Sequence, residues 1–252
     1  MLIYELFKKD LQIMISILIT NFNKGNFLKR TLESCRSQLD KNFEIIFFDD
    51  NSTDDSLKIV KNFINKNKKI KFKLIKRKGK KYLYNSYNQM SAIMYSLKSS
   101  SGKYISLLDA DDIFLKKKIK ILNKTINKTQ KKILYNSYFI LQNKKYFTNN
   151  RHFLIRSLIW PIFPPTSCLT IEKKLFQRVL KKVSFKNFPN CWLDFRLAVY
   201  FSKYQRKEVL YLNEKLTTYR KNVDGNDNKY TNFLSLYYWK RKFDAIMVNI
   251  KI

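Results

Sequence analysis

The first half of the chain alternates between two hydrophobic patterns. Short apolar runs, typical of buried strands, are each followed by a segment with apolar residues three or four positions apart, which is typical of a helix packed on a sheet. The predicted strands are 13–19, 43–48, 70–77, 104–109 and 133–141. The predicted helices are 27–35, after a cap at Asn26, and 55–65, 84–98 and 115–128. This order indicates βαβ units on a mostly parallel sheet.

The second half is less regular. The segment 151–167 carries all but one of the prolines and is expected to be an ordered loop or lid. The remaining predicted elements are a strand at 166–171, helices at 173–182 and 192–204, and an extended segment at 209–220. The basic and aromatic stretch 233–250 is expected to be a helix packed on the core, and a helix lying on a surface is the alternative.

Composition indicates a folded protein with a strong positive charge. Hydrophobic residues make up 45% of the 252 positions, which is enough to build a core. Lys and Arg number 51 against 19 Asp and Glu, so the net charge is +32. Such a surface attracts nucleic acid, anionic lipid or phosphorylated substrates. Because Lys, Asn and Ile are abundant throughout the chain, a general lysine bias explains the charge equally well.

The cysteine and histidine content argues against metal or disulfide frameworks. Three widely spaced cysteines and the single His152 form no zinc-binding pattern and no disulfide framework. Free thiols are consistent with a reducing compartment. No apolar run approaches the roughly 18 residues of a membrane-spanning helix, and the run 13–19 lacks the features of a signal peptide. We therefore expect a cytoplasmic protein.

Polar side chains gather at three predicted strand ends. They are Thr20 to Asn23, Asp49 with Asp50, and Asp109 with Asp111 and Asp112. In open α/β sheets, ligands bind beyond the carboxyl ends of the strands, and an Asp-x-Asp pair there suits a hard divalent cation. The structural alternatives are that Asp112 caps the next helix, and that residues 49–52 form an Asx turn into a helix capped by Thr53 or Asp54.

Three segments together resemble the nucleotide-sugar-dependent glycosyltransferases of family 2, which have the GT-A fold. They are ISILITNFNKGNFLKRTLESCRSQ, FEIIFFDDNSTDDS and YISLLDADD, which cover 15–112 in the family's order and spacing. The resemblance implies an α/β fold with a mostly parallel sheet flanked by helices, in a single domain over 1–252. About 13–112 would bind the nucleotide sugar, about 113–232 the acceptor, and 233–252 would form a basic, aromatic helix.

The resemblance also implies roles for particular residues. Asp50 is similar to the carboxylate that binds the nucleotide base, and Thr20 and Asn23 to residues that line the nucleotide pocket. Asp111 resembles the carboxylate that reaches a Mn²⁺ or Mg²⁺ ion on the diphosphate, with Asp109 in support. An acidic side chain opposite a uracil ring would accept the imide N–H, a donor that cytosine lacks.

Two positions depart from the family's pattern. Asn88 lies where relatives have an Ala-Arg-Asn-x-Gly run, but Tyr87 occupies the arginine position, so a basic residue of 76–81 is expected to substitute. In LTTYRKN, Asn222 stands where many relatives have histidine after Tyr-Arg. His152 lies in a different loop and is not expected to replace it.

Asp194 is the candidate catalytic base. It opens the helix 192–204 and resembles the family's acidic residue at a helix start beneath the acceptor. A carboxylate at a helix N-terminus stays ionised and is able to accept a proton. The structural alternative is a helix cap or a partner for Arg196.

The resemblance therefore implies a metal-dependent, inverting hexosyltransferase that uses a nucleoside-diphosphate sugar, with UDP as the expected nucleotide. The acceptor is expected to be a cell-surface glycan or lipid-linked saccharide, with peripheral contact to an anionic membrane. A polyanion-binding protein without catalysis is the rival from another class. The chain has no recognisable nucleic-acid motif, and residues 21–25 are not the glycine-rich loop of a nucleotidyltransferase.

Overall fold

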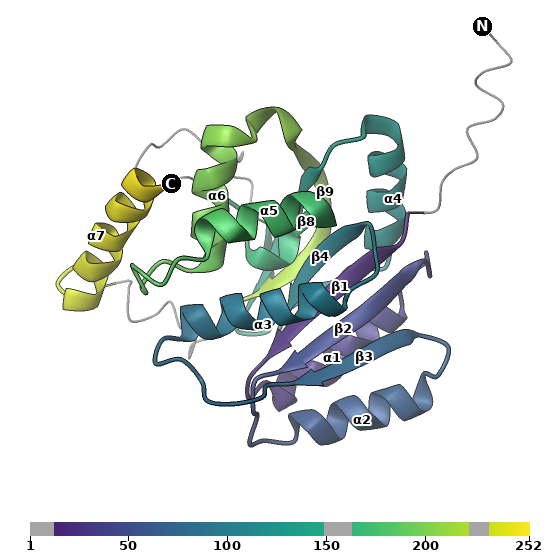
Figure 1. The fold of residues 1–252 in the computed structure, drawn as a ribbon. Helices are drawn as coiled ribbons and strands as arrows, with labels where there is room; N and C mark the ends of the chain where they lie inside the picture. Colours follow the sequence, from purple (N-terminus) through teal and green to yellow (C-terminus); the bar gives the residue numbers. More distant parts are fainter. Residues whose placement is uncertain (1–12, 149–162, 222–231) are drawn as a thin grey trace, which may run out of the picture.

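The computed structural model describes residues 13–148, 163–221 and 232–252 (Figure 1). The strands are β1 (Ile15–Asn21), β2 (Phe43–Asp49), β3 (Lys71–Lys76), β4 (Tyr104–Asp109), β5 (Ile113–Phe114), β6 (Ile133–Gln142), β7 (Lys145–Thr148), β8 (Leu169–Glu172) and β9 (Val209–Arg220). The α-helices are α1 (Gly25–Arg36), α2 (Ser56–Lys66), α3 (Asn85–Ser99), α4 (Lys118–Thr129), α5 (Lys173–Val183), α6 (Leu193–Tyr204) and α7 (Leu236–Lys251). Single 3-10 turns are formed by Thr166–Cys168 and Arg206–Glu208.

The described strands form one sheet in the order β3-β2-β1-β4-β8-β6-β9-β5, with β7 paired to β6. The first four of these strands are mutually parallel, as the alternating pattern predicts. β8 is antiparallel to both of its neighbours, β4 and β6, whereas β9 runs parallel to β6. The fold is therefore a mixed α/β sandwich whose first four strands have the predicted parallel topology.

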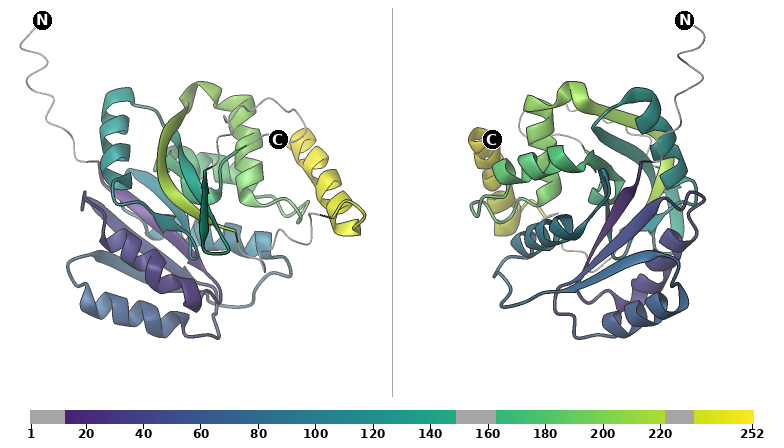
Figure 2. Two further views of the ribbon diagram at one scale, coloured as in Figure 1. Left: turned by 180° about the vertical axis from the view of Figure 1, so that it is seen from behind. Right: turned by 45° about the vertical axis from the view of Figure 1, so that its right-hand side comes forward.

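Helices cover both faces of the sheet (Figure 2). Along β1 the side chains alternate: Ile17 and Ile19 join one apolar cluster with α1, α2 and α4, while Leu18 joins the other with α3, α5 and α6. This alternation follows from the two-residue period of a strand. Because both faces are covered, the central strands read as continuous apolar runs in the sequence.

A smaller cluster joins the last helix to the body of the protein. Ala245 and Val248 of α7 pack against Phe195 and Val199 of α6, together with Cys191. In Figure 1 α7 lies at the outer edge of the molecule, beside α6 and far from β3. The predicted packing of this helix on the core is confirmed for one of its faces.

Several predicted element boundaries are wrong for local reasons. Asn26 does not cap α1, because the helix already begins at Gly25, whose N–H is bound by the Asp54 carboxylate at 2.8 Å. α4 begins at Lys118 rather than 115, because residues before it form β5 and pair with β9. Residues 166–168 form a 3-10 turn ahead of β8. Most of the predicted lid, 151–162, lies outside the described residues.

Candidate active site

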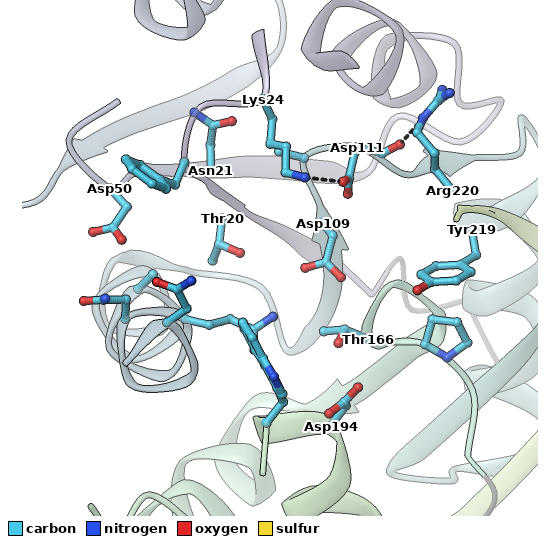
Figure 3. Close-up of a pocket in the computed structure, with 18 of the residues that line it drawn as sticks. Thr20, Asn21, Lys24, Asp50, Asp109, Asp111, Thr166, Asp194, Tyr219 and Arg220 are labelled. Atoms are coloured by element: carbon cyan, nitrogen blue, oxygen red, sulfur yellow. Dashed lines mark hydrogen bonds and ion pairs between the residues drawn. The ribbon is translucent and has the colours of Figure 1, made fainter. Parts of the chain in front are cut away.

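A cavity of about 500 Å³ opens at the carboxyl ends of β1, β2 and β4 (Figure 3). The sheet register brings the three predicted strand ends together: Thr20 pairs with Asp109 across β1 and β4, and Asn21 with Asp49 across β1 and β2. The residues lining the cavity are Thr20, Asn21, Phe22, Lys24, Asp50, Asn85, Asn88, Gln89, Ala92, Asp109, Ala110, Asp111, Tyr138, Phe163, Pro165, Thr166, Trp192, Asp194, Tyr219, Arg220, Lys221 and Arg241. Its volume is in the range of small-molecule sites.

The wall between β1 and β2 is built by a polar network. Asn21 donates to Asp49 and to Ser52, each at 3.0 Å, and the Ser52 N–H donates back to Asp49. Asn23 has a left-handed backbone (φ 51°), and its side-chain oxygen accepts from the Thr53 N–H at 2.8 Å. Asp49 and Asn23 therefore shape the loops, and Asn23 is not among the residues that line the cavity.

At one end of the cavity Asp50 meets two basic residues. Its carboxylate is paired with the buried Arg77 guanidinium, and Lys81 Nζ lies 3.9 Å from its other oxygen. Arg77 also donates to the Asn88 main-chain oxygen and to Ser91 Oγ. Two basic residues of 76–81 therefore reach Asp50, while the expectation that this segment supplies a nucleotide or sugar contact stays a prediction.

Asn88 lines the same end of the cavity, but its amide is used structurally. Its oxygen accepts from the Tyr82 N–H and its nitrogen donates to the Tyr82 carbonyl, both at 2.9 Å. This paired contact holds the loop before α3 in place. Asn88 therefore positions the loop before α3, and its expected contact with the nucleotide stays a prediction.

Carboxylates from two strand and helix ends converge at the centre. Asp109 ends β4, Asp111 lies in the loop after it, and Asp194 faces them from the start of α6 (Figure 3). Burial, followed by the negative charges of Asp111 and Asp194, raises the pKa of Asp109 to about 7. Asp111 is balanced by Lys24, whose Nζ lies 2.8 Å from its Oδ2. Each ionised carboxylate raises the energy of its ionised neighbour. A cation placed between them would relieve this repulsion.

Asp112 does not cap α4, so that structural alternative is wrong. Its carboxylate is buried and accepts the Arg220 N–H at 2.8 Å, which joins the loop after β4 to the end of β9. Burial and the charges of Asp109 and Asp111 raise its pKa. The Arg220 guanidinium in turn donates to the Asp111 carbonyl and lies over the Phe27 ring. This brings the Tyr-Arg pair of LTTYRKN to the cavity.

Asp194 lies in the first turn of α6, where its Oδ1 accepts the Phe195 N–H at 2.7 Å. The neighbouring Arg196 is buried, and its five N–H groups are directed to main-chain carbonyls. Those carbonyls belong to Val183, Phe185, Asn187, Phe188 and Cys191. Since a guanidinium has five donors, Arg196 is used to hold the α5–α6 connection, and the interpretation of Asp194 as its partner is wrong.

The model of the protein family described as glycosyl transferase family 2 matches residues 16–200. This chain belongs to that family. The match includes all three segments on which the resemblance rests except Ile15, and it extends through β8, α5 and most of α6 into the second half of the cavity. The predicted family membership is therefore confirmed.

Relatives and solved structures agree with this assignment. An uncharacterized glycosyltransferase of Rickettsia conorii is 30% identical over 192 residues, which cover 73% of this chain and 30% of the relative. The UDP-Glc:alpha-D-GlcNAc-diphosphoundecaprenol beta-1,3-glucosyltransferase WfaP of Escherichia coli is 38% identical over 106 residues, covering 42% of this chain and 38% of that protein. The chain spans 16% to 30% of the first three curated relatives.

The fold is that of GT-A glycosyltransferases. TarS of Staphylococcus aureus in complex with UDP-GlcNAc superposes with a TM-score of 0.64 at 16% identity, over 84% of this chain and 60% of the TarS chain. The mannosyltransferase PcManGT of Pyrobaculum calidifontis, in complex with GDP-Man and Mn²⁺, gives 0.55 at 13% identity, over 84% and 57%. Among the described helices, none has the length and apolar character needed to cross a bilayer.

The donor set of this family-2 site fits a divalent cation held jointly with a substrate. Within the described residues, no group of three or more His, Cys, Asp or Glu is arranged to hold a metal by itself. Mg²⁺ and similar hard ions are commonly bound by one or two carboxylates together with substrate phosphates. Asp111 and Asp109 provide such a pair. Asn222 and His152 lie outside the described residues.

The lining residues that sequence reasoning missed include Lys24, Gln89 and Tyr138. Lys24 reaches Asp111 from the β1–α1 loop, Gln89 hydrogen-bonds Asp109 from α3, and Tyr138 enters from the middle of β6. The sequence contained a signal for Lys24 as a lining residue, because it is the first charged residue after the first predicted strand, within the family motif. Gln89 and Tyr138 carried none, since only the packing of α3 and β6 against β4 turns them toward the cavity.

Proposed function

We propose that this glycosyltransferase is a metal-dependent, inverting enzyme that transfers a sugar from a nucleoside-diphosphate sugar, with UDP as the nucleotide, to a hydroxyl group. The supporting observation is a single cavity with Asp50 at one end, Asp109 and Asp111 at its centre, and Asp194 on the facing wall. Such an arrangement suits a nucleotide base, a diphosphate and an acceptor that lie one after another along the cavity. The whole described chain acts as one GT-A domain, with a donor half at about 13–112 and an acceptor half at about 113–232.

The acceptor in this proposal is a lipid-linked saccharide or a cell-surface glycan, and the enzyme works at the cytoplasmic face of an anionic membrane. The WfaP relative is a glucosyltransferase whose acceptor is a saccharide linked to diphosphoundecaprenol. TarS was solved with UDP and UDP-GlcNAc, and PcManGT with GDP-Man and Mn²⁺. The ligands bound in these structures support a nucleotide sugar as the donor of this enzyme and Mn²⁺ or Mg²⁺ as its ion.

The charged lining groups and Thr20 have roles in the proposed reaction. Asp50, kept in place by Arg77, accepts the imide N–H of the uracil ring, and Thr20 with the adjoining loops lines the ribose side. Asp111 and Asp109 would hold Mn²⁺ or Mg²⁺, which when bound neutralises charge on the departing diphosphate. Lys24 and Arg220 add positive charge from the same side. Preorganised charges of this kind stabilise a leaving group because they need no rearrangement.

Asp194 acts as the general base. It accepts the proton of the acceptor hydroxyl while that oxygen bonds to the anomeric carbon of the donor. The bond from the anomeric carbon to the phosphate oxygen breaks at the same time, and the nucleoside diphosphate leaves with the electron pair. Attack opposite the leaving group inverts the anomeric centre.

The donor is tested by thermal shift with UDP, GDP, dTDP, CDP and ADP, each with and without Mn²⁺. Because a ligand that binds the folded state raises its apparent stability, we expect the largest shift for UDP with Mn²⁺. The inverting step is tested by the anomeric configuration of the product from a UDP-sugar. No shift with any nucleotide, with tight binding of polyanions, would favour the non-catalytic alternative.

A further inference from the structure

The C-terminal helix α7 has one face fixed to the protein. Asp244, Ala245 and Val248 are buried against the body, and the Asp244 carboxylate accepts both the main-chain and side-chain N–H groups of Asn190 at 2.8 and 2.9 Å. At the helix end, the Tyr204 hydroxyl donates to the Ile252 carbonyl at 2.6 Å. These contacts from α6 and its preceding loop set the rotation of α7 about its own axis.

The opposite face of α7 is apolar and exposed. We call its five residues the outer stripe: Leu236, Trp239, Phe243, Ile246 and Ile250, which are 67%, 58%, 61%, 44% and 72% exposed. Their spacing of three, four, three and four residues places them within about 80° of the helix circumference. A core-packed helix normally turns such a stripe inward, whereas here the inward face is the one with Asp244 and Ala245.

Basic residues flank the outer stripe on both sides. On the helix circumference, Lys240 and Lys251 lie to one side of it and Lys242 to the other. In the described segment 232–252 the single acidic residue is Asp244, which is buried and hydrogen-bonded to Asn190. An apolar stripe with lysines on both sides and an indole among its side chains is the pattern of helices that lie in the headgroup region of a bilayer.

The position of α7 connects this surface to the cavity. Arg241, on the inward side of the helix, lines the cavity together with Trp192 and Asp194. The helix therefore contributes one side chain, Arg241, to the wall of the cavity near Asp194. A lipid-linked acceptor held in a membrane against the outer stripe would lie on the same side of the molecule as Asp194.

We propose that the outer stripe of α7 docks the enzyme on an anionic lipid bilayer. The apolar side chains enter the boundary of the acyl chains, and the flanking lysines contact anionic headgroups. The net charge of +32 adds long-range attraction to such a surface. A second copy of the chain fits less well, because two such helices would bring their lysines together without acidic partners. The consequence for the acceptor rests on the proposed function, but membrane docking itself does not.

The test is flotation with vesicles of phosphatidylcholine alone or mixed in equal parts with phosphatidylglycerol. Wild type is expected to float with the anionic vesicles and not with the neutral ones. The double variant Trp239→Ser with Phe243→Ser should bind the anionic vesicles at least about tenfold more weakly, since it removes two large apolar side chains that the bilayer would cover. The matched control is Tyr146→Ser with Phe147→Ser, which removes two exposed aromatic residues of β7 and should bind like wild type.

A second pair of variants tests the charge. Lys240→Gln with Lys242→Gln should weaken binding to anionic vesicles, whereas Lys124→Gln with Lys128→Gln on α4 should have little effect. The proposal is overturned if the outer-stripe variant floats like wild type, or if light scattering shows a wild-type dimer that this variant converts to monomer. The melting temperature of every variant is measured with and without UDP, which reports folding and donor binding separately. If UDP does not bind, the flotation experiment still tests membrane docking.

Discussion

Lys24 and Asp111 form the central ion pair of the cavity, and their side chains are only 33% and 16% exposed. In the proposed reaction the Asp111 carboxylate would also hold the divalent ion, so Lys24 and the ion would compete for it in the absence of a donor. A bound diphosphate would offer Lys24 another anionic partner, and nucleotide and metal would then bind together.

This competition leads to a prediction for Lys24→Gln. Removing the ammonium should strengthen Mn²⁺ binding to the nucleotide-free protein several-fold, because opposite charges at this distance interact strongly in a partly buried site. The fraction of free Mn²⁺ is measured by electron paramagnetic resonance. Lys29→Gln, at an exposed position of α1, is the control and should not change the affinity. The metal assignment is lost if Asp111→Asn binds Mn²⁺ as tightly as wild type.

A second prediction concerns Asp194, which lies at the opposite side of the cavity from Asp50. Asp194→Asn keeps the size of the side chain and its oxygen near the Phe195 N–H, but it removes the basicity. We expect transfer to fall by roughly 10²-fold or more, the usual effect of losing a general base, with the thermal shift by UDP and Mn²⁺ unchanged. A parallel drop in melting temperature and activity would indicate a helix cap instead. Near-normal transfer would require another base.

At the level of elements, the strands and the strand-end carboxylates were predictable because both signals are local. Apolar runs predict β1, β2 and β4, and a parallel sheet necessarily brings their carboxyl ends to one edge. What the sequence does not contain is the direction of each side chain in the loops. Asp49 and Asp50 are adjacent, yet Asp49 builds the wall with Asn21 while Asp50 faces the cavity.

The capping of α1 shows the same limit. Its N-terminus is capped by Asp54, 29 residues away, because α1 and α2 begin side by side after neighbouring strands. Asp54 Oδ2 accepts the Gly25 N–H at 2.8 Å, and Oδ1 accepts the Ser56 N–H at 3.0 Å. A search for a cap near Asn26 could not find it. The outer stripe of α7 is visible in the sequence, but which face of that helix is covered depends on α6 and Asn190.

The double role of Asp54 gives a prediction for these elements. Asp54→Ala should lower the free energy of unfolding by about 1–2 kcal/mol, since it removes the partner of two helix N-termini, measured by urea denaturation. Asp55→Ala is the matched control, because this adjacent side chain makes no capping hydrogen bond. A loss of equal size in both variants would contradict the bridging role.

The pH dependence of this difference follows from the pKa of Asp54. Burial raises that pKa, but hydrogen bonds from Ser56 and Gly25 outweigh it and the net shift is downward. A carboxyl group with a lowered pKa in the folded state contributes stability above its ordinary pKa of about 4, and the contribution is lost as the pH falls further. Wild type and Asp54→Ala should therefore converge in stability in acid, at pH values below about 4.

At the scale of the whole molecule, two opposite charge distributions coexist. The exterior is dominated by the excess of 51 basic over 19 acidic residues, while carboxylates gather in the cavity around Asp109. A long-range positive field raises the local concentration of any polyanion, including an anionic membrane or a nucleotide sugar. Selection among them belongs to the cavity, where short contacts and shape decide.

Salt should separate these two contributions, and this is the last prediction. Association of the enzyme with a DNA duplex rests on the exterior charge, so its affinity should fall steeply as salt rises from tens to a few hundred millimolar, through release of counterions. Binding of UDP with Mn²⁺ depends on contacts in a partly buried site, which ions screen much less. Both affinities are measured on one preparation, by fluorescence anisotropy for DNA and by calorimetry for UDP. If DNA binding survives high salt and selects a sequence while UDP binding is lost, polyanion binding would replace sugar transfer as the favoured function. The cavity would then not be the part of the molecule that discriminates between ligands.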